Sequence, residues 1–125
     1  MKHMKKEFSL KRRTGSFRFA FNGIIFLFKY EPNAWIHLTI AILVIVFGFI
    51  LGLKAAEWCL VILAIGLVLM AEAMNTAIEN MVDMISPENN ELAGRIKDLS
   101  AAGVLLAAIG ATTAGLIIFI PKIIT

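Results

Sequence analysis

Three acids and one amide are spaced so that they share one side of a helix. At 100° per residue they fall within an arc of about 80°. These residues are Glu72, Asn75, Glu79 and Asp83. Glu72 directly follows an apolar stretch, and Glu79 lies about 10 Å further along the helix axis, towards the polar end. If this helix enters a membrane, Glu72 is therefore the deepest acid. A carboxylate at such a depth is costly unless it is paired or hydrated, so we consider Glu72 a functional residue that could accept a proton.

Lys and Arg are absent from the apolar runs of the chain. We therefore expect the acids to lack basic partners inside the membrane, which makes a purely structural role in ion pairs the weaker interpretation. A bound cation is the better one. Carboxylate oxygens near a membrane surface suit Mg²⁺, which keeps water ligands and bridges to phosphate groups. Glu31, just before the first apolar run, is a further acid that could complete such a site.

The segment before the third apolar run adds charges at the same level. Lys97 could neutralise phosphate oxygens, and Asp98 could orient this lysine or cap the following helix. The sequence contains neither a GxxxxGK[ST] loop nor a GxGxxG motif. A nucleotide would therefore be held by side chains and a metal ion rather than by a glycine-rich cradle.

The elements that must position these residues are membrane helices. Hydrophobic residues make up 59% of the 125 residues, compared with roughly 45–50% in soluble domains. A spanning helix needs about 20 apolar residues, and the sequence predicts three, over about 34–53, 57–85 and 93–120, in one domain covering 1–125. The single cysteine excludes a disulfide framework within the chain.

The distribution of positive charge predicts the orientation. Of the 12 Lys and Arg residues, only Lys54 and Lys122 lie on the side opposite to the others. The positive-inside rule then places the N-terminus and the second loop in the cytoplasm and the C-terminus outside. The basic excess faces anionic lipid head groups, so we do not expect nucleic acid as a partner.

Before the first span, apolar residues recur with helical spacing and predict an amphipathic helix over about 8–30, ended by Pro32. The stripe consists of Phe17, Phe21, Ile24, Ile25 and Phe28. It could lie on the cytoplasmic leaflet or pack against the other helices, and both can hold together. The predicted fold is therefore an all-α integral membrane protein with a surface helix and three transmembrane helices.

The acidic segment and the loop after it resemble a known family. The letters E-A-M-N-T-A-I-E-N-M-V-D from Glu72 to Asp83 are similar to the E-x-x-N-[ST]-A-I-E-x-x-V-D signature of the small bacterial membrane diacylglycerol kinases, which include undecaprenol kinases. Glu91 to Asp98 resembles the x-G-R-x-K-D segment that follows it. The resemblance covers nearly the whole chain. It implies an ATP- and Mg²⁺-dependent lipid kinase of the bacterial cytoplasmic membrane, working as a homotrimer with composite active sites between subunits.

The resemblance also implies roles for individual residues. Glu72 matches the catalytic base, with Asn75 beside it in the active site, and Glu31 and Glu79 match the metal-binding acids. Positions that match contacts of the bound nucleotide and metal are Arg12, Glu31, Glu79, Asp83, Glu88, Lys97 and Asp98. Where the enterobacterial member has a tyrosine and a histidine, this chain has Phe19 and Asn90, which implies different contacts with the nucleotide.

Two further questions concern the acceptor and the class of protein. The Tyr30–His37 segment and the Phe119–Lys122 ending resemble the undecaprenol kinases more than the enterobacterial diacylglycerol kinases, which favours undecaprenol over diacylglycerol.

A small proton-coupled transporter is the alternative to a kinase, because such proteins also carry one deep glutamate. Three spans and several acids near one surface argue against it. A non-catalytic assembly subunit would leave the acidic stripe without a purpose.

Overall fold

The computed structural model describes residues 9–125 and consists of four helices. They are α1 (Leu10–Tyr30), α2 (Pro32–Leu51), α3 (Ala55–Ile85) and α4 (Glu91–Ile124). Within the described residues no strand is present, and α2, α3 and α4 are each long and apolar enough to cross a membrane. The predicted all-α fold with three such helices is therefore confirmed. The expected start of the first helix at residue 8 lies outside the described residues.

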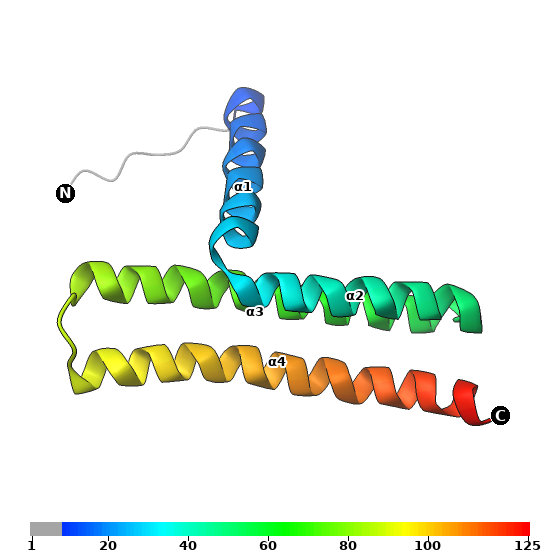
Figure 1. The fold of residues 1–125 in the computed structure, drawn as a ribbon. Helices are drawn as coiled ribbons and strands as arrows, with labels where there is room; N and C mark the ends of the chain where they lie inside the picture. The colour runs from blue at the N-terminus through cyan, green and yellow to red at the C-terminus, as the bar shows by residue number, and fades with distance from the viewer. Residues whose placement is uncertain (1–8) are drawn as a thin grey trace.

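The three apolar helices lie side by side, and α1 meets them at its C-terminal end and projects away from them at a steep angle (Figure 1). Helix α3 contacts α1, α2 and α4, and the chain reverses direction at each turn, so α3 is antiparallel to both α2 and α4. Helices α3 and α4 extend well beyond the point where α1 meets α2 (Figure 1). The acidic half of α3 therefore lies partly beside α2 and partly in this extension.

The turn between α1 and α2 is made by Glu31, which ends one helix and caps the next. Its backbone N–H donates to the carbonyl of Leu27, and its side chain accepts from the backbone N–H of Asn33 at 3.4 Å. Pro32 is the first residue of α2, where a missing N–H costs nothing. Pro32 therefore starts α2 as well as marking the end of α1, and α2 begins earlier than the sequence predicts.

Residues at the edges of the apolar runs also set the end of α2 and the starts of α3 and α4. Helix α2 ends at Leu51 and is capped by Gly52, whose φ of +71° suits glycine. The backbone N–H of Lys54 donates to the carboxylate of Glu57 at the start of α3. Asn90 caps α4 by accepting from the backbone N–H of Ala93 at 2.8 Å. Because α4 begins there, the interpretation of Asp98 as a helix cap is wrong.

Small and branched residues bring the three apolar helices together. Val61, Ile118 and Leu53 form a buried cluster packed against Trp58. The ring of Trp58 also covers Gly48, where an added Cβ would stand 2.7 Å from ring carbon Cη2. Most of the large apolar side chains remain exposed in this single chain. Such a surface suits contact with lipid or with other protein chains rather than with water.

Candidate active site

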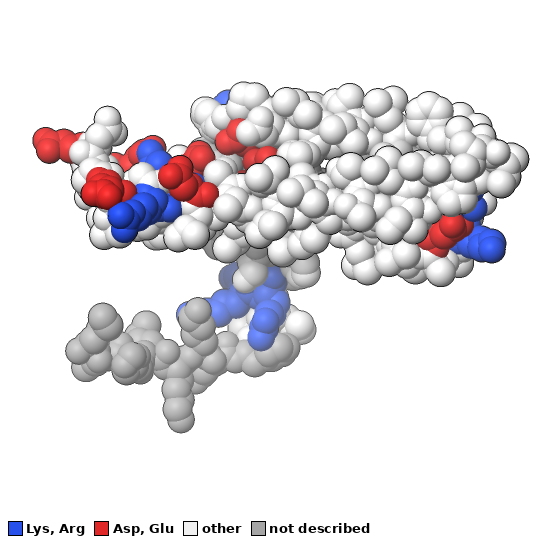
Figure 2. All heavy atoms as spheres, turned by 90° about the horizontal axis from the view of Figure 1, so that it is seen from below, with Lys and Arg blue, Asp and Glu red and all other residues white. Residues whose placement is uncertain are grey.

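Charged groups gather at the two ends of the long helices, and the surface between them is almost free of charge (Figure 2). One end carries most of the acids. The opposite end carries an ion pair at 3.0 Å between Glu57 of α3 and Lys122 of α4. The predicted site residues of α3, α4 and their connecting loop therefore belong to the acidic end or to its border with the apolar region.

Glu72 is the most deeply buried functional group among the described residues, with 1% of its surface exposed. Its Oε1 lies 3.0 Å from Nε2 of His37 on α2. Either atom can supply the proton of this contact: Nε2 of His37 donates to an ionised carboxylate, and a protonated carboxyl donates to Nε2. The other oxygen, Oε2, is buried and has no hydrogen-bond partner.

This contact corrects one expectation from the sequence. We expected no partner for the acids inside the apolar runs, but that was wrong for Glu72, which pairs with His37. From the sequence, His37 is a polar interruption of the first apolar run that is expected at a helix interface rather than at a metal ion, and the structure places it at the interface of α2 and α3. Its pairing depends on the register between α2 and α3, which no spacing within a single helix reveals.

Asn75 lies on the next turn of α3 and is also buried, with 7% of its surface exposed. Its side-chain N–H donates to Oε1 of Glu79 at 3.2 Å. Its carbonyl oxygen, Oδ1, is buried without a partner. Leaving a buried polar atom unpaired costs about 1–3 kcal/mol, and unpaired groups in native structures need an explanation such as a catalytic role. Two such oxygens therefore lie on neighbouring turns, one from Glu72 and one from Asn75.

Thr76 connects the acid before α2 to the acidic stripe of α3. Its hydroxyl donates to Oε2 of Glu31 at 3.3 Å, and it was not among the predicted site residues. The contact brings Glu31 to the same level as the turn of α3 that follows Glu72. Thr76 occupies the [ST] position of the signature, which was the one available signal for it.

The described residues, 9–125, contain no group of three or more His, Cys, Asp or Glu side chains that could enclose a metal ion. Glu31 and Glu79 both present carboxylate oxygens, and each is fixed by a hydrogen bond from α3. These hard oxygen donors fit Mg²⁺, which usually takes one or two carboxylates together with water and substrate phosphates.

Asp83 and Lys97 face each other across the extension of α3 and α4. Their side chains form an ion pair and are 62% and 40% exposed. The four residues of the predicted stripe therefore meet different neighbours: Glu72 meets α2, Glu79 meets Asn75 of its own helix, and Asp83 meets α4. Their common helix face serves several contacts rather than one ligand cluster.

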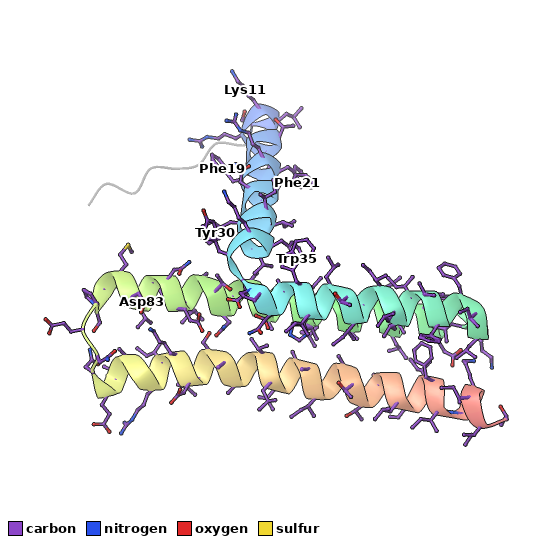
Figure 3. The ribbon with its side chains drawn as sticks, in the orientation of Figure 1. Lys11, Phe19, Phe21, Tyr30, Trp35 and Asp83 are labelled. Atoms are coloured by element: carbon purple, nitrogen blue, oxygen red, sulfur yellow. The ribbon has the colours of Figure 1, made fainter. Side chains whose placement is uncertain are left out.

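The remaining predicted residues are Arg12, Glu88 and Asp98, and all three are exposed. No side-chain contact within the described residues joins them to the acids of α3. Asp98 follows Lys97 on α4, and Glu88 lies in the loop between α3 and α4. Arg12 lies in the first turn of α1. Figure 3 shows Lys11 of that turn at the end of α1 furthest from the other helices and from Asp83. Within one chain Arg12 is therefore remote from the acids.

The two positions that depart from the enterobacterial pattern differ in their surroundings. Asn90 is used in the fold, because it caps α4 and its amide also donates to the hydroxyl of Ser86. Phe19 is exposed on α1.

Two hollows are lined by residues that contact the acids of the site, one by His37 and the other by Thr76. An apolar groove of about 390 Å³ lies between α2, α3 and α4, with His37 at the end next to Glu72. A second hollow of about 440 Å³ lies between α1 and α3 and is lined partly by Thr76. The site therefore borders both an apolar space and a space beneath the amphipathic helix.

Comparison with known proteins identifies the family. The family model described as prokaryotic diacylglycerol kinase matches residues 18–119. The undecaprenol kinase of Bacillus subtilis (strain 168) is 37% identical over 114 residues, covering 91% of this chain and 93% of that protein. The diacylglycerol kinase of Haemophilus influenzae is 32% identical over 118 residues, covering 93% and 100%. That of Synechocystis is 35% identical over 111 residues, covering 88% and 63%.

These matches confirm the resemblance seen in the acidic signature and favour a kinase over a transporter. They extend across the amphipathic helix and all three apolar helices. The relatives named as kinases are phosphotransferases that act on a lipid alcohol. The chain therefore belongs to the prokaryotic diacylglycerol kinase family and is a membrane lipid kinase.

Proposed function

We propose that this protein transfers the γ-phosphoryl group of MgATP to the terminal hydroxyl of a membrane lipid, with undecaprenol preferred over diacylglycerol. The observation that carries the proposal is the buried carboxyl of Glu72, which has one oxygen held by His37 and the other without a partner. A proton acceptor in an apolar setting suits an alcohol that arrives with its hydrocarbon chain. The undecaprenol kinase relative supports the choice of acceptor.

In the proposed reaction, Glu72 Oε2 accepts the hydroxyl proton while the hydroxyl oxygen attacks the γ-phosphorus. The bond between the γ-phosphorus and the bridging oxygen breaks, and ADP leaves. Such transfers depend mainly on positioning and charge neutralisation. Asn75, with its unpartnered Oδ1 on the next turn, is proposed to orient the reacting groups and the carboxylate of Glu79.

The negative charge of the phosphates requires cations beside the base. Glu31 and Glu79 would hold Mg²⁺, which when bound neutralises phosphate oxygens. Their hydrogen bonds to Thr76 and Asn75 fix both carboxylates before any ligand arrives. We place Lys97 on the phosphate oxygens, oriented by its pairing with Asp83.

Further contacts with the nucleotide are proposed for residues around the extension of α3 and α4. They are Asp83, Glu88 and Asp98, together with Arg12 of α1. The first turn of α1 points away from the acids of its own chain (Figure 3). Arg12 therefore acts at the site of a neighbouring subunit, which agrees with a homotrimer that has composite sites.

Helix geometry supports a placement in the bacterial cytoplasmic membrane. The stretch of α3 from Ala55 to Thr76 measures about 31 Å at 1.5 Å per residue, close to the roughly 30 Å hydrocarbon core. Thr76 holds Glu31 at the junction of α1 and α2, so α1 would cross at the level of the head groups. The basic N-terminus then lies in the cytoplasm, the extension of α3 and α4 projects there, and the C-terminus lies outside.

The test is a kinase assay with two lipids. Purified protein in detergent micelles receives MgATP labelled in the γ-phosphate and either undecaprenol or diacylglycerol. We expect label in the lipid fraction, faster with undecaprenol, and labelling at least about 100-fold slower with Glu72→Gln. Label in neither lipid would contradict the proposed reaction. Faster labelling of diacylglycerol would overturn only the choice of acceptor.

A further inference from the structure

We propose that His37 is a positioning residue for the catalytic carboxyl of Glu72. It holds Oε1 so that Oε2 faces the acceptor hydroxyl. This inference rests on the proposed role of Glu72 as the base. In the described part of the chain, His37 is the one side chain within hydrogen-bond distance of this carboxyl, with 3.0 Å between Nε2 and Oε1.

The need for such a contact follows from the flexibility of glutamate. The last torsion of a glutamate side chain is broad, so the plane of the carboxylate can turn over a wide range at little cost. This torsion alone therefore does not define the direction in which the carboxylate oxygens point. A donor that binds one oxygen removes this freedom, and a hydrogen bond to a charged group is among the stronger ones. His37 binds one oxygen and leaves the other unpaired.

The position of His37 relative to Glu72 is fixed by the packing of α2 against α3. It belongs to α2, and the start of α2 is fixed against α3 by the hydrogen bond between Glu31 and Thr76. The two contacts lie on the same side of α2 and α3, so together they define how α2 is placed along α3. The side chain of His37 is 21% exposed and lines the apolar groove, so it lies between the carboxyl of Glu72 and the space beside it.

Two substitutions at His37 distinguish the effect of losing the N–H donor from the effect of changing the shape of the side chain. His37→Gln keeps an N–H donor near the position of Nε2, whereas His37→Leu removes it and matches the apolar lining of the groove. In His37→Leu we expect kcat to fall about 10- to 150-fold, the range for loss of one hydrogen bond to a charged group. The KM for MgATP should stay within about three-fold, because the residues proposed for the nucleotide are elsewhere. His37→Gln should restore most of kcat.

Thr39→Val is the matched control. Thr39 is also a polar residue of α2, but its hydroxyl donates to the carbonyl of Trp35 in the same helix. This variant should keep the kcat of the wild type. Thermal unfolding in micelles should show a cooperative transition for every variant, with the midpoint lowered only where His37→Leu leaves the buried carboxyl of Glu72 without its donor. If His37→Leu does not fold, His37→Asn takes its place, because its amide is too short to reach Glu72 and should give the same loss of kcat.

A double variant completes the test. If His37 acts through Glu72, adding His37→Leu to Glu72→Gln should lower the residual turnover no further. An unchanged kcat in His37→Leu, an equal loss in His37→Gln, or a full additional loss in the double variant would overturn the inference. These results differ from failure of the proposed function, in which Glu72→Gln itself would keep the turnover of the wild type.

Discussion

Exchanging the charges of Asp83 and Lys97 distinguishes a structural ion pair from a site for phosphate. The pair joins α3 to α4, and its side chains are 62% and 40% exposed. At that exposure solvent screens the attraction, and an ion pair contributes about 0–1 kcal/mol to stability. A charge-assisted contact with phosphate is worth about 1.5–3 kcal/mol, which corresponds to roughly 10- to 150-fold in kcat/KM.

The experiment compares Lys97→Gln with the exchanged double variant, Asp83→Lys with Lys97→Asp. Lys97→Gln should lower kcat/KM for MgATP by about 10- to 150-fold while the free energy of unfolding falls by no more than about 1 kcal/mol. The exchanged variant can form the ion pair again, so it should regain stability. It should stay nearly inactive, because the positive charge has moved from α4 to α3.

The readouts are initial rates with labelled MgATP at saturating lipid and thermal unfolding of the same preparations. Arg95→Gln serves as the reference, because Arg95 is an exposed charge of the same helix that pairs with Glu91. Recovery of activity in the exchanged variant would refute the reasoning, because it would show that the pair only holds the helices together.

Three further predictions concern the buried part of the site and the packing below it. Glu72→Gln should lower turnover by at least about 100-fold without lowering the unfolding midpoint, since it replaces a buried charge with a neutral group of the same shape; turnover within ten-fold of wild type would contradict this. Thr76→Val should raise the Mg²⁺ concentration for half-maximal activity several-fold at unchanged saturating rate, and an unchanged Mg²⁺ titration would argue against a metal site here. Gly48→Ala should destabilise the protein by about 1–3 kcal/mol in chemical unfolding, because its Cβ meets Trp58; Gly66→Ala, which meets nothing within the chain, should not.

Much of the fold follows from composition and spacing. Apolar runs of sufficient length predict three spanning helices, and the structure contains three that are long enough. The exact ends were less accessible, because polar caps rather than hydrophobicity set them. Asn90 and Pro32 start α4 and α2 before their apolar runs begin.

Those features of the site that depend on the spacing of residues within one helix could be predicted from the sequence. The 100° rule places Glu72, Asn75 and Glu79 on one face, and two of them are joined by a hydrogen bond. Contacts between helices were not predictable in this way. His37 and Thr76 acquire their partners only when α2 is set beside α3.

The two ion pairs between α3 and α4 have a mechanical consequence. Glu57 pairs with Lys122 at one end of this helix hairpin, and Asp83 pairs with Lys97 at the other. Sliding one helix past the other by a single turn, about 5.4 Å, would break both. Tilting the hairpin as a unit keeps both ion pairs, so we expect tilting rather than sliding in a bilayer of unsuitable thickness.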